Sequence, residues 1–152
     1  MYYRIYLMRG FKMVDHFRKF LNHYMACWSN SSLVEMKELI SPDYQAREIT
    51  NGEIVDFGYI ESLIGWEQGF NFIEEHRGEW SLNELYSIPL RKDEWLSVIS
   101  ASLVINGKRL DTANLFFQTF RREHNTDWKL IRSYIEAGIP VGNLSTLHLP
   151  ST

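Results

Sequence analysis

Apolar residues near the start of the chain recur at the spacing of an α-helix, and polar residues fill the opposite side. Residues 29–32 read Ser-Asn-Ser-Ser, which ends this helix. Ser32, with Glu35 three residues later, has the pattern of a capping box and predicts a second helix over residues 33–40, before Ser41-Pro42. The apolar stripe of the first helix consists of Met13, Val14, Phe17, Phe20, Leu21, Tyr24 and Trp28.

A short strand pair is expected next. Residues 44–50 alternate loosely between apolar and polar side chains, as a strand does. Asn51-Gly52 supplies the positive φ angles that both central residues of a tight hairpin turn require. Residues 53–56 should therefore return alongside the first strand.

Helical spacing resumes over residues 59–77, and Gly78 is the expected C-terminal stop. Gly65 and Gly69 interrupt the pattern, and each weakens a helix interior by about 1 kcal/mol relative to Ala. Two interpretations stay open. Either the two glycines allow a close backbone approach on one face, or the helix begins only at Trp66.

The second half of the chain changes to a composition typical of β-strands. Turn signals at Asn106-Gly107 and at residues 124–127 indicate that consecutive strands pair antiparallel. Helices followed by a strand meander predict an α+β domain whose helices pack on one face of a bent sheet. The expected strands cover residues 80–90, 94–106, 109–124 and 128–137.

The length of 152 residues fits one domain. We expect this domain to cover residues 13–139. Residues 1–12 are then a leader and residues 140–152 a C-terminal tail. No internal repeat or linker divides the chain.

Charge and composition argue against several partners. The formal net charge is −3, and the basic doublets are scattered among acidic residues, so nucleic acid is not an expected partner. No apolar run reaches the ~18 residues that span a bilayer, so no membrane partner is expected either. The single cysteine, Cys27, cannot form an internal disulfide and favours a reduced compartment, which we expect to be the cytoplasm.

Several segments stand in a recognisable order. The first helix ends in Tyr-Met-Ala-Cys-Trp (24–28), Pro-Asp-Tyr (42–44) opens a strand, residues 65–70 read Gly-Trp-Glu-Gln-Gly-Phe, and residues 128–136 form the last strand. Over residues 13–139 this layout resembles the nuclear-transport-factor-2-like superfamily, especially its SnoaL-like (polyketide-cyclase-like) branch. The resemblance implies a cystatin-like fold, in which a cone-shaped, bent antiparallel sheet carries three N-terminal helices on its concave face.

The resemblance also implies an apolar pocket between the helices and the sheet, and often a homodimer through the outer sheet face. Its members include isomerases, dehydratases, cyclases, hydrolases and binding proteins, so the fold selects no single activity. Three functions stay open for this chain: binding of a small, mostly apolar organic molecule, acid/base catalysis on such a molecule, or homodimeric assembly without a ligand.

Polar residues set among large apolar ones on the strands are the candidate pocket groups. A carboxylate in an apolar cavity resists ionisation and can serve as a general acid or base. Glu136 is the leading candidate for this role, with Tyr134 beside it, because SnoaL-like enzymes often carry an acid near the end of the final strand. The other expected pocket residues are Tyr24, Trp66, Tyr86, Asn114, Phe116 and Gln118.

Four further residues are weaker candidates. Glu84 is another acid on the strands, and Glu48 could act as a base, although an exposed hairpin edge explains Glu48 equally well. His16 and His23 lie on one side of the first helix and could supply a base, but boundary or core positions are commoner for such residues. No spacing of His, Cys and acids resembles a zinc site, and no glycine-rich phosphate loop follows a strand, so no metal or cofactor is expected.

Both faces of the later strands are largely apolar. Phe116 and Phe120 share one face of their strand, while Leu115 and Phe117 share the other. One face must cover the helices, and the other needs a partner, which supports a homodimer. Alternation alone does not decide which of the two faces lines the pocket.

Overall fold

The computed structural model describes residues 2–124 and 127–144, with side chains from Val14 onward. Helices α1 (Tyr2–Ser29) and α2 (Leu33–Glu38) precede strands β1 (Ile40–Thr50) and β2 (Glu53–Gly58). Among the described residues, no helix combines the length and the apolar character that crossing a membrane requires. The remaining elements are α3 (Tyr59–His76), β3 (Glu79–Arg91), β4 (Glu94–Ile105), β5 (Lys108–Arg109), β6 (Thr112–Glu123), β7 (Asp127–Pro140) and α4 (Val141–Leu144).

One sheet contains all the described strands, in the order β2-β1-β7-β6-β4-β3, with the short β5 paired to β4. All neighbouring strands run antiparallel except β1 and β7, which are parallel. The sheet is therefore mixed, and the expectation of a purely antiparallel sheet is corrected. The connection through α3 takes the chain from β2 to the opposite edge of the sheet, where β3 begins the antiparallel meander. The last strand of this meander, β7, returns beside β1 and runs parallel to it.

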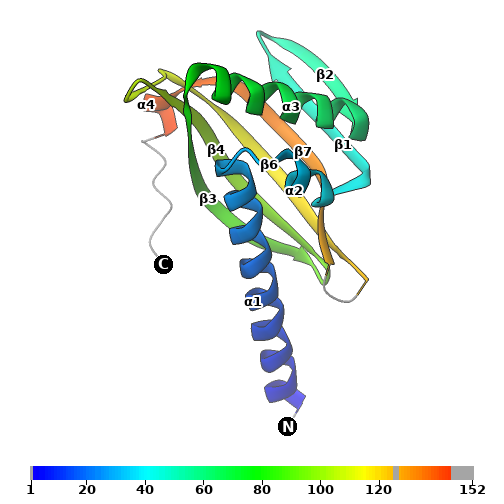
Figure 1. Cartoon of the computed structure of the whole chain (residues 1–152). Helices are drawn as coiled ribbons and strands as arrows, with labels where there is room; N and C mark the ends of the chain where they lie inside the picture. The colour runs from blue at the N-terminus through cyan, green and yellow to red at the C-terminus, as the bar shows by residue number, and fades with distance from the viewer. Residues whose placement is uncertain (1, 125–126, 145–152) are drawn as a thin grey trace.

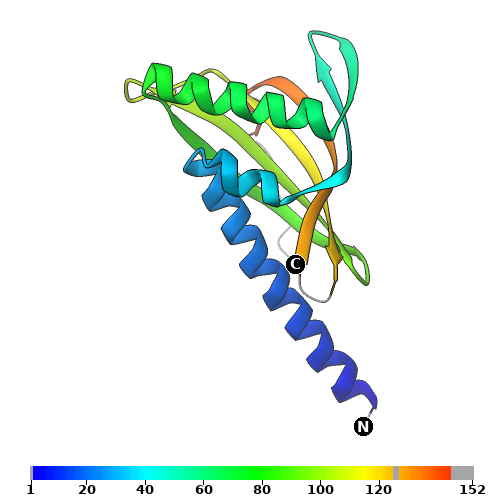
Figure 2. The ribbon, with the colours of Figure 1, turned by 45° about the vertical axis from the view of Figure 1, so that its right-hand side comes forward.

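The sheet bends around the three helices. Figures 1 and 2 show α1, α2 and α3 on one face, with α3 lying across one end of the sheet. Bulges in the ladders between β3 and β4 and between β6 and β7 help to bend the strands. The predicted α+β architecture, with a bent sheet and three helices on its concave face, is confirmed.

Most predicted helices and strands lie where the hydrophobic pattern puts them. Helix α3 begins at Tyr59, so the alternative start at Trp66 is wrong. The side chain of Ser32 makes no capping hydrogen bond, so the expected capping box is wrong as well. Helix α1 begins at Tyr2 and α4 covers Val141–Leu144, and the domain limits at residues 13 and 139 stay a prediction. The rest of the expected tail lies outside the described residues.

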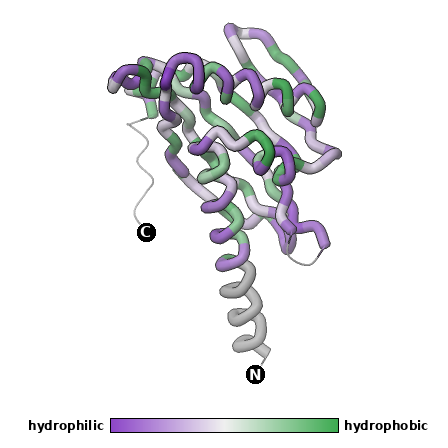
Figure 3. Tube along the Cα trace, viewed as in Figure 1, coloured by the Kyte–Doolittle hydropathy of each residue, from purple (hydrophilic) through white to green (hydrophobic). Residues whose placement is uncertain are grey.

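The core lies between α1 and the concave face of the sheet. From Val14 onward, hydrophobic and hydrophilic residues alternate along α1, as Figure 3 shows, because one side of this helix is buried. Phe17 of the buried side stacks on Trp95 with ring centroids 4.7 Å apart and packs against Phe120. Trp28, near the end of α1, instead contacts Trp66 of α3. The core thus fills one end of the concave face, and Trp28 lies where the core meets the other end.

Candidate functional site

Strand pairing decides which residues face the helices. On β6, Phe116, Gln118 and Phe120 occupy the inner face, because Gln118 bonds to α1 and Phe120 packs against it. Gln118 lies opposite Ser133 on β7, and Phe116 lies opposite Ile135. Alternate residues of β7 from Ser133 onward therefore point to the concave side.

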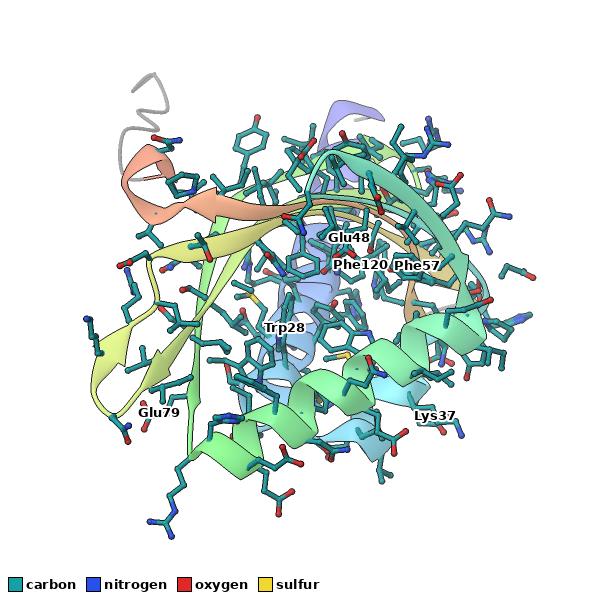
Figure 4. All side chains as sticks on the ribbon, turned by 90° about the horizontal axis from the view of Figure 1, so that it is seen from above. Trp28, Lys37, Glu48, Phe57, Glu79 and Phe120 are labelled. Carbon is teal, nitrogen blue, oxygen red and sulfur yellow. The ribbon has the colours of Figure 1, made fainter. Side chains whose placement is uncertain are left out.

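A cavity of about 620 Å³ lies between α3, the β1–β2 hairpin and the concave face of the sheet. This volume falls within the range of roughly 300 to 1,000 Å³ that small-molecule sites occupy. Figure 4 shows Trp28, Glu48 and Phe57 within the space that the strands and α3 enclose. The aromatic lining consists of Trp28, Tyr44, Phe57, Trp66, Trp80 and Phe116.

The aromatic wall is held by contacts among its own rings. Trp28 meets Trp66 edge to face with centroids 4.9 Å apart, and it meets Phe116 in the same way at 4.9 Å. The indole Nε1 of Trp80 donates a hydrogen bond of 3.0 Å to Ser31 Oγ, which fixes a third ring. Edge-to-face pairs add stability beyond their buried area, so these contacts help to hold the aromatic wall in place.

The structure brings four of the predicted pocket residues together. Trp66, Asn114, Phe116 and Gln118 all line the cavity. The Asn114 side chain accepts a hydrogen bond from the Gly138 amide at 3.0 Å, which fixes its carbonyl oxygen. These four residues come from α3 and β6, elements far apart in the chain, and their part in binding a ligand stays a prediction.

Tyr24 lies behind the cavity wall. Its side chain is fully buried, and its hydroxyl donates a hydrogen bond of 2.8 Å to Gln118 Oε1. Burial raises the pKa of this phenol well above its usual value, so the hydroxyl stays a donor. Tyr24 is absent from the lining, and its role is to hold Gln118, contrary to the expectation that it contacts a ligand.

Glu136 and Tyr134 lie on the outer face, and their expected place in the cavity is corrected. A bulge lies between Leu130, which faces the core, and Arg132, which pairs with Thr119. The bulge switches the alternation, so Tyr134 lies opposite Phe117 and points outward. Tyr134 is 41% exposed, and its hydroxyl donates a hydrogen bond of 2.7 Å to Glu136 Oε1. This bond raises the pKa of Tyr134.

The same kind of irregularity moves Tyr86 out of the expected pocket. A bulge lies between Glu84 and Tyr86, so Tyr86 pairs with Val98 and takes the outer face, where it is 47% exposed. Glu84 stays on the inner side, but its carboxylate is bound by Arg18 of α1 at 2.5 and 2.8 Å. That ion pair lowers the pKa of Glu84. Neither Glu84 nor Tyr86 lines the cavity.

Three acids do line the cavity, Glu48, Asp56 and Glu61, and Glu48 is the one on the inner face of β1. It sits on β1 between Val55 of β2 and Ile135 of β7, which are both apolar and both part of the lining. Tyr44 lies four residues earlier on the same face, and burial, with a contribution from the Glu48 charge, raises its pKa to about 12. Alternation along β1 could have given Glu48 an inner position, because buried Tyr44 and Ala46 precede it on the same side.

Two buried polar atoms of the lining have no hydrogen-bond partner among the described residues. They are Oγ of Ser62, on α3, and Nε1 of Trp28. The two side chains are 4% and 1% exposed, respectively. Buried polar atoms nearly always have a hydrogen-bond partner, so at these two atoms a water or another bound molecule would supply the missing hydrogen bond.

The candidate histidines lie outside the cavity lining. His16 and His23 are exposed on α1. His23 Nε2 lies 3.6 Å from Sγ of the buried Cys27, whose thiol also lies 3.4 Å from Glu35 Oε2. Burial, with the Glu35 interaction adding to it, raises the pKa of Cys27 to about 11, so this thiol is not prepared as a nucleophile.

A scan of protein-family models gives no match to this sequence, and a sequence search of curated proteins gives none either. Solved structures do match. One is a nuclear-transport-factor-2-like protein with a cystatin-like fold from Novosphingobium aromaticivorans, at 12% identity and a TM-score of 0.65, covering 93% of each chain. Another, from Pseudomonas putida KT2440, has 12% identity and a TM-score of 0.64, and the match covers 91% of this chain and 95% of that one.

A third similar structure is a candidate scytalone dehydratase from Novosphingobium aromaticivorans, at 15% identity and a TM-score of 0.62. That match covers 88% of this chain and 96% of the other. Identities this low establish the fold and leave the activity open. The mixed bent sheet, its three helices and these matches together show that the chain has the fold of the nuclear-transport-factor-2-like proteins.

Proposed function

We propose that this protein binds a small, mostly apolar organic molecule in the cavity between α3 and the concave sheet face. The observation that carries the proposal is the cavity itself, which is large enough for such a molecule and is walled by aromatic side chains. Two polar groups of the lining, Gln118 and Asn114, are fixed by hydrogen bonds. Within the fold, the chain layout favours the SnoaL-like branch.

The test is a thermal-shift screen of aromatic and alicyclic compounds, followed by calorimetry on the compounds that raise the melting temperature. Gly65→Leu places a large side chain on the cavity lining, at a position where an added Cβ meets no atom within 4 Å. We expect this variant to fold and to lose at least about tenfold in affinity. Gln68→Leu, at an exposed position of α3 outside the lining, is the matched control and should bind normally. A screen without binders would contradict the proposal.

The second candidate function is acid/base catalysis by Glu48. Its carboxylate shares the cavity with Val55 and Ile135 and lies near the neutral hydroxyl of Tyr44, an arrangement suited to taking a proton from a C–H acid. The resemblance to a candidate scytalone dehydratase is consistent with such chemistry. Hydrogen exchange from D2O into a bound ketone, followed by mass spectrometry, tests it. Exchange should disappear in Glu48→Gln and persist in Glu53→Gln, and exchange that survives Glu48→Gln would contradict it.

The proposed partner is a second copy of this chain, bound through the outer face of the sheet. Leu96, Val98, Leu115 and Phe117 are all apolar side chains of that face. A sheet face in contact with water normally carries polar side chains at such positions. Sedimentation velocity should give a dimer that Phe117→Arg converts to a monomer. A wild-type monomer at micromolar concentration would contradict this assignment.

The proposed location is the cytoplasm. Its support is Cys27, a free thiol in the protein interior that has no second cysteine to pair with. Cell fractionation with an antibody against the native protein tests this location, and recovery from an oxidising compartment would contradict it.

A further inference from the structure

The cavity has an uneven charge. Its described lining includes the carboxylates of Glu48, Asp56 and Glu61 and contains no Lys, Arg or His side chain. Arg47 neutralises Asp56 through two hydrogen bonds, of 2.7 and 2.9 Å. Glu48 and Glu61 form no ion pair within the described part of the chain. Two carboxylates of this lining therefore lack a compensating cation from the protein.

The two carboxylates differ in how they are held. Glu61 is exposed at the start of α3 and accepts a hydrogen bond of 3.2 Å from the Gly58 amide, so water and the backbone stabilise its charge. Glu48 is half-buried on the inner face of β1, beside Val55 and Ile135. A negative charge in apolar surroundings is stabilised most by a positive charge brought close to it. Glu48 is thus the natural partner for a cation that enters the cavity.

The aromatic lining favours the same kind of ligand. Trp28, Trp66 and Trp80 converge on the cavity, together with Phe57 and Phe116. The faces of indole rings attract organic cations, and this attraction grows as water is removed. Ser62 Oγ, which is buried without a described partner, is an acceptor that an N–H group of a ligand could use. An anionic ligand would meet only like charge in this lining.

We infer that the ligand of this cavity is an organic cation, a protonated amine on an apolar or aromatic body, whose ammonium group pairs with Glu48. The inference rests on the proposed binding function and adds the charge of the ligand to it. The body of the molecule lies against the tryptophan rings, and the ammonium group donates to Glu48 and to Ser62. The lining discriminates by charge, because it offers a cation both a counter-ion and π faces, and it offers an anion neither.

The experiment compares compounds that differ only in their head group. Phenyl, naphthyl and decalin bodies each carry an aminoethyl, a hydroxyethyl or a carboxymethyl group, and calorimetry at neutral pH measures the affinity of each compound. We expect the amine to bind at least about tenfold tighter than the alcohol with the same body, and the acid to bind weakest. Equal affinity of amine and alcohol, or tighter binding of the acid, would overturn the assignment of a cation and leave the binding function standing.

Two variants locate the effect. Glu48→Gln keeps the shape and the acceptor oxygen of the side chain but removes its charge, so it should abolish the preference for the amine without weakening the alcohol. Glu53→Gln removes the same charge at an exposed position of the same hairpin, outside the lining, and should keep the preference. An amine preference that survives Glu48→Gln contradicts the assigned partner. Absence of binding for all bodies and head groups counts against the proposed function itself, and the inference fails with it.

Discussion

The hydroxyl of Tyr24 donates a hydrogen bond of 2.8 Å to Oε1 of Gln118, and both side chains are buried. The bond joins α1 to β6 just behind the cavity. For the cavity, this bond fixes the orientation of the Gln118 amide. The amide Nε2 is then directed toward Ser133 Oγ, 3.4 Å away. One buried pair thus links the packing of the longest helix to a polar group of the cavity lining.

Tyr24→Phe should lower the free energy of unfolding by about 1 to 3 kcal/mol, because it leaves the Gln118 oxygen buried without a donor. Urea denaturation of the variant and the wild type measures this change. Replacement of both partners, as in Tyr24→Phe with Gln118→Met, should recover much of the loss, since no buried acceptor then remains. If the double variant loses more unfolding free energy than the two single variants lose together, the hydrogen bond is not the main contribution of this pair to stability.

Gly65→Ala should raise the free energy of unfolding by about 0.5 to 1 kcal/mol. Gly65 lies in the interior of α3, where Ala is the better helix former, and an added Cβ meets no atom within 4 Å. The midpoint of thermal unfolding measures the gain. Gly52→Ala is the contrasting change, because Gly52 has φ +78° in the hairpin turn, and it should destabilise the protein. A loss of stability in Gly65→Ala would show that the glycine is needed for a close contact.

The sequence predicts the elements of this fold well, because local patterns specify them. Apolar residues on the buried side of α1 recur every three or four positions. Phe17, Leu21, Tyr24 and Trp28 could therefore be assigned to the core from their spacing. The dipeptide at Asn51-Gly52 fixes its hairpin by backbone conformation alone, with φ 52° and 78°.

The faces of the strands could not be predicted in the same way. Alternation along β7 groups Leu130 with Tyr134 and Glu136, but the bulge before Arg132 separates them onto opposite faces. A bulge depends on how two strands pair, which the spacing within one strand does not record. Strand β1 pairs regularly with both of its neighbours from Gln45 to Glu48, and there plain alternation gives the correct inner position. The parallel pairing of β1 with β7 is likewise set by the path of the whole chain.

Cys27 should react slowly in the folded protein. Its thiol is buried and its pKa is raised to about 11, so at pH ~8 the thiolate fraction is about a hundredfold below that of a free cysteine. The raised pKa also means that this group contributes stability below its ordinary pKa of 9.0, and that the contribution is lost as the pH rises toward about 11. An aromatic disulfide reagent, used with and without urea, measures the difference in rate, and equal rates would contradict the assigned burial.

The ion pair between Arg18 and Glu84 should make the stability of the protein fall with acid. The Glu84 carboxylate accepts two hydrogen bonds from the guanidinium, which lower its pKa below the ordinary 4.5. A carboxyl group whose pKa is lower in the folded state contributes stability above its unfolded pKa, and loses this contribution as the pH falls through the folded value. Both partners are partly exposed, so the contribution at neutral pH should be about 0.2 to 1 kcal/mol.

Glu84→Gln removes the titrating group and should therefore flatten the pH dependence of the unfolding free energy below about pH 5. Glu79→Gln, an exposed position on the same strand, is the matched control and should keep the wild-type slope. Urea denaturation across the acid range measures both. If Glu84→Gln and the wild type lose stability in parallel as the pH falls, the pair between α1 and β3 contributes nothing to the acid sensitivity, and the loss must come from other carboxylates.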